Sequence, residues 1–351
     1  MTLDERSMAH EGDRAHSQTV VRRISVIAPM RNAQAHVDTF VRDLADQDFA
    51  GEIVVLVADG GSANGSVERL RAAARDAGID LTLLDNPAGW VSPGLNACIR
   101  RADGDLIVRL DFHSRYPPDY LRRCAELSER TGAWNVGGRL VPSGETPTER
   151  AVACAMDSPF GGIGWSRAAA GGEPVDTDTV TFGAFRPEAF ERAGLFDEAL
   201  IRNQDAELNL RIRQAGGRIL LDPAITVLYR PRGTLRGVWR QYFEYGFWRA
   251  MVMRKHRKPA SLRTVAPLLF VLLTATLLAA APGSAIARRL LAAKWLAYAT
   301  AATAFGAHGL RRRREPWPLL PRVIATFPTF HIAFGVGQAW AWLRGLTRTR
   351  P

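Results

Sequence analysis

The chain has 351 residues, enough for about two domains, and a formal net charge of +11 at pH 7. The charge is unevenly divided: residues 1–207 hold 22 Arg and Lys against 32 Asp and Glu, whereas residues 208–351 hold 24 against 3. A strongly basic half indicates nucleic acid or a membrane as its partner, and the long uncharged runs in that half argue against nucleic acid. The three cysteines form no C-x-x-C pair and are interpreted as small apolar residues in a reducing compartment.

The N-terminal tail, residues 1–21, is polar and lacks the apolar core of a signal peptide, so we expect it to be disordered and the domain after it to stay in the cytoplasm. Short apolar runs then alternate with helical patterns. The predicted strands are 24–28, 53–58, 81–84 and 105–110, and the predicted helices are 34–46, 64–77 and 92–102, the last capped by Ser92. This alternation predicts an α/β fold with a largely parallel sheet, in which ligands bind at the carboxyl ends of the strands. Three residues lie at such predicted strand ends: Pro29, Asp59 and Asp111.

The following segment is less regular. Residues 134–140 and 180–186 predict strands, 187–193 predict a short helix, and 157–177, rich in Gly, Ala and Pro, predict a loop. A further helix is predicted over 203–216, with Asn203 as its cap and Gly216-Gly217 as its end.

The last third of the chain predicts a membrane region. Residues 233–257 form a basic helical pattern with six aromatic side chains, which suits a membrane interface. Three apolar runs follow, at about 264–284, 290–310 and 322–343, each long enough to cross about 30 Å of hydrocarbon. Buried soluble helices are the alternative, and the third run, which contains Pro328 and His331, could be re-entrant.

Basic clusters predict the orientation of these runs. The clusters at 254–258 and 311–314 should lie in the cytoplasm by the positive-inside rule, so the first two runs form a hairpin with its 282–289 loop outside. The predicted organisation is a tail, an α/β domain, an interfacial helix and a transmembrane region, at 1–21, 22–232, 233–260 and 261–346.

A carboxylate and an imidazole follow the strand 105–110. Asp111 and His113 are two residues apart, and alternate residues at a strand end project to the same side, so the two can converge on one ligand. Such a pair could hold a divalent cation. Two alternatives stay open: Asp111 could cap the next helix, and His113 could be a solvated loop residue.

Four motifs occur in a fixed order along the chain. They are Ser25-Val-Ile-Ala-Pro-Met-Arg-Asn32, Asp59-Gly-Gly-Ser62, Arg109-Leu-Asp-Phe-His-Ser-Arg-Tyr-Pro117 and Asn203-Gln-Asp-Ala-Glu-Leu208. With them, residues 23 to about 250 resemble the family 2 glycosyltransferases, whose GT-A fold is a Rossmann-like nucleotide-diphospho-sugar transferase domain. The membrane tail resembles, more loosely, that of the succinoglycan glucosyltransferase subgroup. The chain departs from the family pattern at Gln204, where Glu is usual, and has the subgroup's His113 at the last position of the D-x-D motif.

The resemblance implies a nucleotide-sugar donor, with a UDP-hexose expected. Asp59 would accept a hydrogen bond from the base, and the loop from Pro29 to Asn32 would wall the base and ribose. The implied donor-binding residues are Pro29, Arg31, Asn32, Asp59, Arg109 and Asp111. A divalent cation, Mn²⁺ or Mg²⁺, held through Asp111 and His113 would neutralise the leaving diphosphate. Arg109 could instead be a structural ion-pair partner.

The resemblance also implies a general base, Asp205, that takes the proton of the acceptor hydroxyl. Direct attack without a covalent intermediate inverts the anomeric centre. Asp205 falls at a predicted helix N-terminus, where the helix dipole favours its ionised form. The acceptor is expected to be a glycan or a lipid-linked molecule, and the residues expected on its side are Gln204, Glu207, Gln241, Tyr245 and Trp248. Glu207 could either contact the acceptor or pair with an arginine.

The implied function is membrane-bound sugar transfer in cell-surface polysaccharide synthesis. The enzyme would lie at a bacterial-type inner membrane with its catalytic domain in the cytoplasm, and a polysaccharide assembly complex is a further expected partner. Two alternatives remain. Transfer to a polyprenyl phosphate would need no strong base, and a degenerate transferase that only binds, as a scaffold, is suggested by Gln204 and His113.

Overall fold

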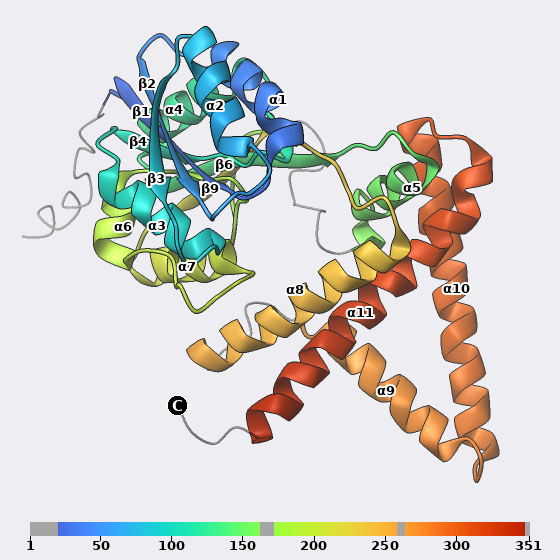
Figure 1. The fold of residues 1–351 in the computed structure, drawn as a ribbon. Helices are drawn as coiled ribbons and strands as arrows, with labels where there is room; N and C mark the ends of the chain where they lie inside the picture. The colour runs from blue at the N-terminus through green and yellow to red at the C-terminus, as the bar shows by residue number, and fades with distance from the viewer. Residues whose placement is uncertain (1–19, 162–171, 258–263, 348–351) are drawn as a thin grey trace, which may run out of the picture.

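The structure is a computed structural model that describes residues 20–161, 172–257 and 264–347. In these ranges nine strands form one sheet in the order β3-β2-β1-β4-β8-β6-β9-β5, with β7 paired to β9 (Figure 1). The strands are β1 (Arg23–Met30), β2 (Glu52–Asp59), β3 (Asp80–Asp85), β4 (Leu106–Arg109), β5 (Ser114–Arg115), β6 (Asn135–Pro142), β7 (Val175–Asp176), β8 (Ala184–Phe185) and β9 (Ile219–Tyr229).

The sheet is mixed, which corrects the prediction of a largely parallel one. The parallel prediction is confirmed for the first half, where β1 pairs with β2 and β4, and β2 pairs with β3. In the second half β8 is antiparallel to β4 and β6, and β5 and β7 are antiparallel to β9. The strand predicted over 180–186 is reduced to Ala184–Phe185. Phe182 has a left-handed backbone conformation, φ 56°, which is incompatible with an extended strand.

Six helices of the described chain cover the two faces of this sheet: α1 (Gln34–Ala45), α2 (Ser66–Asp76), α3 (Val91–Arg101), α4 (Tyr120–Thr131), α6 (Pro187–Ala193) and α7 (Gln204–Gln214). Helix α5 (Pro147–Met156) lies apart from them, against the C-terminal helices. Side chains alternate along β1, so Val26 packs with α1, α2 and α4 on one face and Ile27 packs with α3, α6 and α7 on the other. The result is a three-layer α/β domain (Figure 1). Helix α3 begins one residue earlier than predicted, and Ser92 does not cap it: its hydroxyl donates to the carbonyl of Leu200, 3.0 Å away.

Four longer helices form the C-terminal part: α8 (Leu235–His256), α9 (Ala266–Ala280), α10 (Ala285–Arg313) and α11 (Leu320–Thr347). Helices α8 and α11 approach closely at glycines. A Cβ at Gly246 of α8 would lie 1.9 Å from the carbonyl oxygen of Phe334, and one at Gly337 of α11 would lie 2.1 Å from that of Phe243. Only glycine permits such backbone contact, so these residues fix the spacing of α8 and α11.

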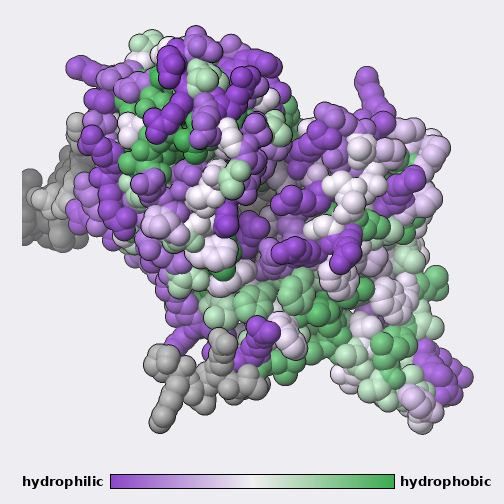
Figure 2. All heavy atoms as spheres, in the orientation of Figure 1, coloured by the Kyte–Doolittle hydropathy of each residue, from purple (hydrophilic) through white to green (hydrophobic). Residues whose placement is uncertain are grey.

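The hairpin of α9 and α10 carries the most exposed apolar surface of this part. Helix α9 has no buried residue in the part of the chain that the structure describes. Its large exposed side chains, with those of the first half of α10, are Leu269, Leu272, Leu273, Leu278, Ile286, Leu290 and Leu296. Figure 2 shows hydrophobic residues gathered over α8 to α11, and hydrophilic ones at the turn between α9 and α10.

Not every predicted span forms an apolar helix long enough to cross a membrane. Among the described residues, one stretch, Trp317–Arg344, meets the requirement by length and composition, and α9 is apolar but has 15 residues. Helix α10 extends beyond the predicted second run and includes Arg288, Arg289 and Lys294. Membrane crossing and the domain limits therefore stay predictions. Most of the predicted 1–21 tail, and residues 162–171 of the predicted 157–177 loop, lie outside the described residues.

The α/β domain is docked on the C-terminal helices through α5 and the turn after it. Arg150 of α5 donates to Glu315 at 2.8 Å, and Asp157 accepts from Arg312 and Arg313. The ring of Phe160 lies among aromatic side chains of α10 and α11, namely Tyr298, Phe305, Phe327 and His331. Two members of the basic cluster 311–314 are thus bound to the α/β domain.

Candidate active site

The carboxyl ends of β1, β2 and β4 meet at one edge of the sheet. Met30 is aligned with Asp59 across β1 and β2, and Ile27 is aligned with Arg109 across β1 and β4. The segments that follow these strands therefore lie side by side, which confirms the predicted placement of Pro29, Asp59 and Asp111 at strand ends.

The loop after β2 is locked to the loop after β1. The carboxylate of Asp59 accepts from the backbone N–H of Ser62 at 3.0 Å and from its hydroxyl at 2.6 Å. The Ser62 hydroxyl oxygen in turn accepts from the backbone N–H of Asn32 at 2.8 Å, and the Asn32 side chain accepts from Ala63 at 3.0 Å. Asn32 itself is left-handed, φ 52°, which Asn tolerates better than most residues. The predicted nucleotide loop is therefore preorganised around Asp59. Two further predicted donor-binding residues belong to the same region. Pro29 lies within β1, and the guanidinium of Arg31 donates to the carbonyl of Gly89 at 3.5 Å.

Asp111 and His113 lie in a tight turn rather than along a strand. The backbone N–H of His113 donates to Oδ1 of Asp111 at 3.1 Å, and that of Asp111 donates to the hydroxyl of Tyr116 at 2.8 Å. The exposed His113 ring packs edge-on against His36, with centroids 4.4 Å apart. Burial, with the neighbouring His113, lowers the pKa of His36, so its imidazole is neutral near pH 7. His36 belongs to α1 and was not foreseen, because its contact with His113 is made through space.

The donor set tests whether a divalent cation fits this turn. Within the described ranges, no group of three or more His, Cys, Asp and Glu side chains is arranged to hold a metal ion. Asp111 and His113 could supply a carboxylate oxygen and an imidazole nitrogen, and oxygens of a bound diphosphate would have to complete the coordination. The residues fit a cation that arrives with an anionic ligand and do not form a closed metal cage.

Arg109 and Asp205 form an ion pair beside this turn. Arg109 is the last residue of β4 and is 4% exposed, and its guanidinium contacts the carboxylate of Asp205 in the first turn of α7. Burial opposes the positive charge, but Asp205 and Asp111 outweigh it and raise the pKa of Arg109. Of the two roles left open for Arg109, the structure shows the ion pair, and donor binding stays a prediction. Asp205 is the carboxylate thereby held at the edge of the site.

The predicted acceptor residues separate into two groups. Gln241 and Tyr245 of α8 come together with Tyr229 at the end of β9: the Gln241 amide donates to both hydroxyl oxygens at 2.9 Å. Tyr229 was missed because β9, which contains Pro223, was not recognised as a strand. Trp248 is half-buried on the same helix.

Gln204 and Glu207 are buried within the α/β domain, 6% and 0% exposed. Glu207 is bound by Arg211 at 2.8 Å, so the predicted arginine pair is present. Asn203 does not cap α7, since its amide donates to the carbonyl of Tyr245 at 3.0 Å.

The three-layer α/β domain, with polar loops at the carboxyl ends of β1, β2 and β4, has the fold of a glycosyltransferase of GT-A type. The family profile described as "Glycosyl transferase family 2" matches residues 25–192. "Succinoglycan biosynthesis protein ExoA" of Rhizobium meliloti (strain 1021) is 31% identical over 320 residues, covering 89% of this chain and 92% of the relative. The chain belongs to glycosyltransferase family 2 and is a glycosyltransferase.

Two more distant comparisons agree. "Dolichyl N-acetyl-alpha-D-glucosaminyl phosphate 3-beta-D-2,3-diacetamido-2,3-dideoxy-beta-D-glucuronosyltransferase" of Methanococcus voltae is 22% identical over 241 residues, covering 66% of this chain and 74% of the relative. The solved structure of the mannosyltransferase PcManGT from Pyrobaculum calidifontis, in complex with GDP-Man and Mn²⁺, has a TM-score of 0.62 at 21% identity. It covers 92% of this chain and 88% of that one, so the two share their fold.

Proposed function

We propose that this chain is a membrane-bound, inverting glycosyltransferase of cell-surface polysaccharide synthesis. It would move a sugar, expected from a UDP-hexose, to a glycan or lipid-linked acceptor. The R. meliloti relative, named for succinoglycan biosynthesis, supports the polysaccharide, and the dolichyl-linked name of the M. voltae relative supports a lipid-linked acceptor. The observation that carries the proposal is the carboxylate of Asp205, held by Arg109 next to the Asp111 turn at the carboxyl edge of the sheet.

The residues divide the reaction between them. Asp59 and the loop from Pro29 to Asn32 would receive the nucleotide, because this loop is already ordered around Ser62. The acceptor oxygen forms a bond to the anomeric carbon while the bond from that carbon to the diphosphate oxygen breaks. The acceptor proton passes to Asp205, and the nucleoside diphosphate leaves with the electron pair. Arg109 would orient the Asp205 carboxylate through the ion pair between them.

A divalent cation would be held by Asp111 and His113 with oxygens of the donor diphosphate. When bound, it would supply positive charge to the departing diphosphate. The mannosyltransferase of P. calidifontis, solved with GDP-Man and Mn²⁺, supports a cation of this kind.

Exposed apolar surface supports membrane attachment. The large apolar side chains of α9 and the first half of α10 would lie in the hydrocarbon region of the bilayer, since a soluble surface rarely exposes a contiguous patch of this kind. The turn at Gly283 would lie on the outer side, and the α/β domain would lie in the cytoplasm, at a bacterial-type inner membrane.

Asp205→Asn tests the proposed chemistry. The amide keeps the size and much of the hydrogen bonding but removes basicity, so transfer should fall by at least ~10²-fold. Donor affinity, measured by calorimetry, should survive, because the proposed donor contacts lie at Asp59 and Asp111. The control is Asp80→Asn. It removes an exposed carboxylate at the first residue of β3, at the end of the strand away from the proposed site.

Unchanged transfer by the Asp205 variant would remove this residue from the mechanism. No transfer by the wild type, over a fair panel of donors and acceptors, would favour the scaffold alternative. Transfer that depends on an added polyprenyl phosphate and yields a lipid-phosphate sugar would favour that acceptor instead.

A further inference from the structure

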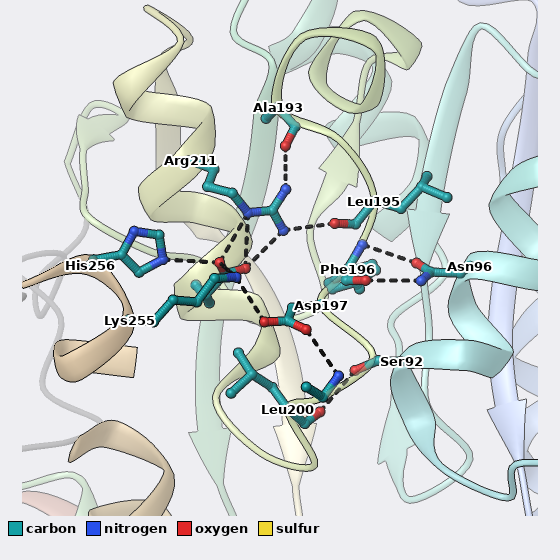
Figure 3. Close-up of polar contacts among 12 residues, drawn as sticks. Ser92, Asn96, Ala193, Leu195, Phe196, Asp197, Leu200, Arg211, Lys255 and His256 are labelled. Carbon is teal, nitrogen blue, oxygen red and sulfur yellow. Dashed lines mark hydrogen bonds and ion pairs between the residues drawn. The ribbon is translucent and has the colours of Figure 1, made fainter. Parts of the chain in front are cut away.

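A second carboxylate of α7 is buried two residues after Asp205. Three groups contact Glu207 (Figure 3): Arg211 at 2.8 Å, Lys255 at 2.6 Å and His256 at 3.0 Å. Burial alone would raise the pKa of Glu207, but Arg211, Lys255 and His256 together lower it to about 2. The carboxylate is therefore ionised at neutral pH, and a buried charge of this kind is tolerated only while its partners stay in place.

Two of these partners come from the C-terminal part of the chain. Lys255 and His256 form the last turn of α8, the helix whose Gly246 packs against the backbone of α11. Arg211 belongs to α7 itself. Glu207 thus joins the helix of the proposed base to the helices that follow the α/β domain.

Lys255 also binds a second carboxylate, which precedes α7. Its ammonium lies 2.7 Å from Asp197 as well as 2.6 Å from Glu207. Asp197 and Glu207 lie on either side of Asp205 in the chain. One ammonium group therefore holds both ends of the segment that presents Asp205.

The opposite side of the same segment is tied to the α/β domain (Figure 3). Asn96 of α3 accepts from the N–H of Phe196 at 3.0 Å and donates to its carbonyl at 2.9 Å. The hydroxyl of Ser92 donates to Leu200, and Arg211 donates to Leu195 at 2.7 Å. Lys255 supplies the anchor from α8, and these contacts supply the anchors from α3 and α7.

Lys255 is the partner that Asp197 and Glu207 share, and Glu207 is also bound by Arg211 and His256. Removal of Lys255 takes one cation away from both carboxylates, one of which is fully buried. The segment would then relax toward water or toward other cations, and Asp205 would move with it.

We propose that the last turn of α8 is a positioning element for the catalytic base: Lys255, with His256, holds Asp197 and Glu207 so that Asp205 faces the donor. The inference rests on the proposed function of Asp205. Lys255 and His256 are positioning residues, because they act through Glu207 and not on the reacting atoms. Docking of the C-terminal helices is then a condition for a correctly formed active site.

The test is Lys255→Met in the full-length protein in lipid nanodiscs, compared with Arg254→Met, which removes the same charge from the same helical turn. Turnover of Lys255→Met should fall by about 10- to 100-fold, because small misplacements of a reacting group have effects of this size. Donor affinity by calorimetry should stay close to wild type. Lys255→Arg, which keeps the charge and can reach both carboxylates, should recover much of the loss. Backbone amides of 204–208 should exchange with deuterium faster in Lys255→Met and at the wild-type rate in Arg254→Met.

Two results would overturn the proposal. One is turnover and amide exchange in Lys255→Met that match Arg254→Met. The other is a loss of donor affinity as large as the loss of turnover, which would indicate a general structural role. Absence of transfer by the wild type would instead contradict the proposed function, and the exchange measurement would still decide whether Lys255 holds the segment.

Discussion

The close contact between α8 and α11 makes Gly246→Ala a sharp perturbation. The added Cβ would lie 1.9 Å from the carbonyl oxygen of Phe334, whereas ordinary contact begins at 3.4 Å, so the two backbones must separate by about 1.5 Å. Overpacking costs about 1–3 kcal/mol, and the upper end applies because the blocking atom is backbone. Alanine is about 1 kcal/mol more favourable than glycine inside a helix, so the net decrease in the free energy of unfolding is about 2 kcal/mol.

The assay is thermal unfolding of the full-length protein in detergent, with sugar transfer measured in parallel. With about 2.1 cal/mol/K per residue, a chain of this length unfolds with an entropy of about 0.7 kcal/mol/K, so Tm should fall by roughly 3 °C. Transfer should fall as well, because α8 also carries Gln241, Tyr245 and Lys255. The control is Gly283→Ala in the turn between α9 and α10, where nothing in the described chain lies within 4 Å of the new Cβ. A Tm for Gly246→Ala equal to that of the control would refute the close packing of α8 on α11.

Three further perturbations give distinct outcomes. Asp111→Ala should abolish transfer, and EDTA should do so reversibly; full activity in excess EDTA would reject the cation. In a background without native cysteines, Gly283→Cys should be labelled from the outer side of the membrane and Ser143→Cys should not, and the reverse pattern would reject the orientation. Glu207→Gln should lower Tm at neutral pH. The folded pKa of about 2 lies below the usual value of 4.5 for Glu, so the ionised form contributes about 3 kcal/mol to stability. This contribution is present above pH 4.5 and is lost as pH falls toward 2. A Tm difference between wild type and Glu207→Gln that stays constant from pH 5 to pH 2.5 would contradict this role.

Local patterns predicted the parallel half of the sheet well. Strands β1 to β4 and helices α1 to α3 fall within one or two residues of their predicted ranges, because buried strands and amphipathic helices carry strong periodic signals. The second half was harder, since β5, β7 and β8 have two residues each and exist only through pairing with distant strands. Helix α5 was missed although it has a readable start, the Thr146 and Glu149 capping box followed by apolar residues.

The candidate site shows the same division. Motif order placed Asp59, Asp111 and Asp205 near one edge of the sheet, because strand ends in such folds converge. Contacts between residues far apart in the sequence could not be predicted from motifs. The packing of His36 on His113 and the binding of Glu207 by Lys255 join segments far apart in the chain, and neither residue type nor spacing distinguishes them from solvated charges.

The attachment of α5 has a consequence for the order of events during synthesis. Ala151, Val152 and Cys154 of α5 are buried against α10 and α11, which leave the ribosome after the α/β domain. Until those helices are made, the nascent α/β domain presents an apolar strip and an unpaired Arg150 where Glu315 will bind. A chain truncated before α10 keeps that strip exposed to water. Aggregation of the truncated chain is the expected outcome when the α/β domain is produced without α10 and α11.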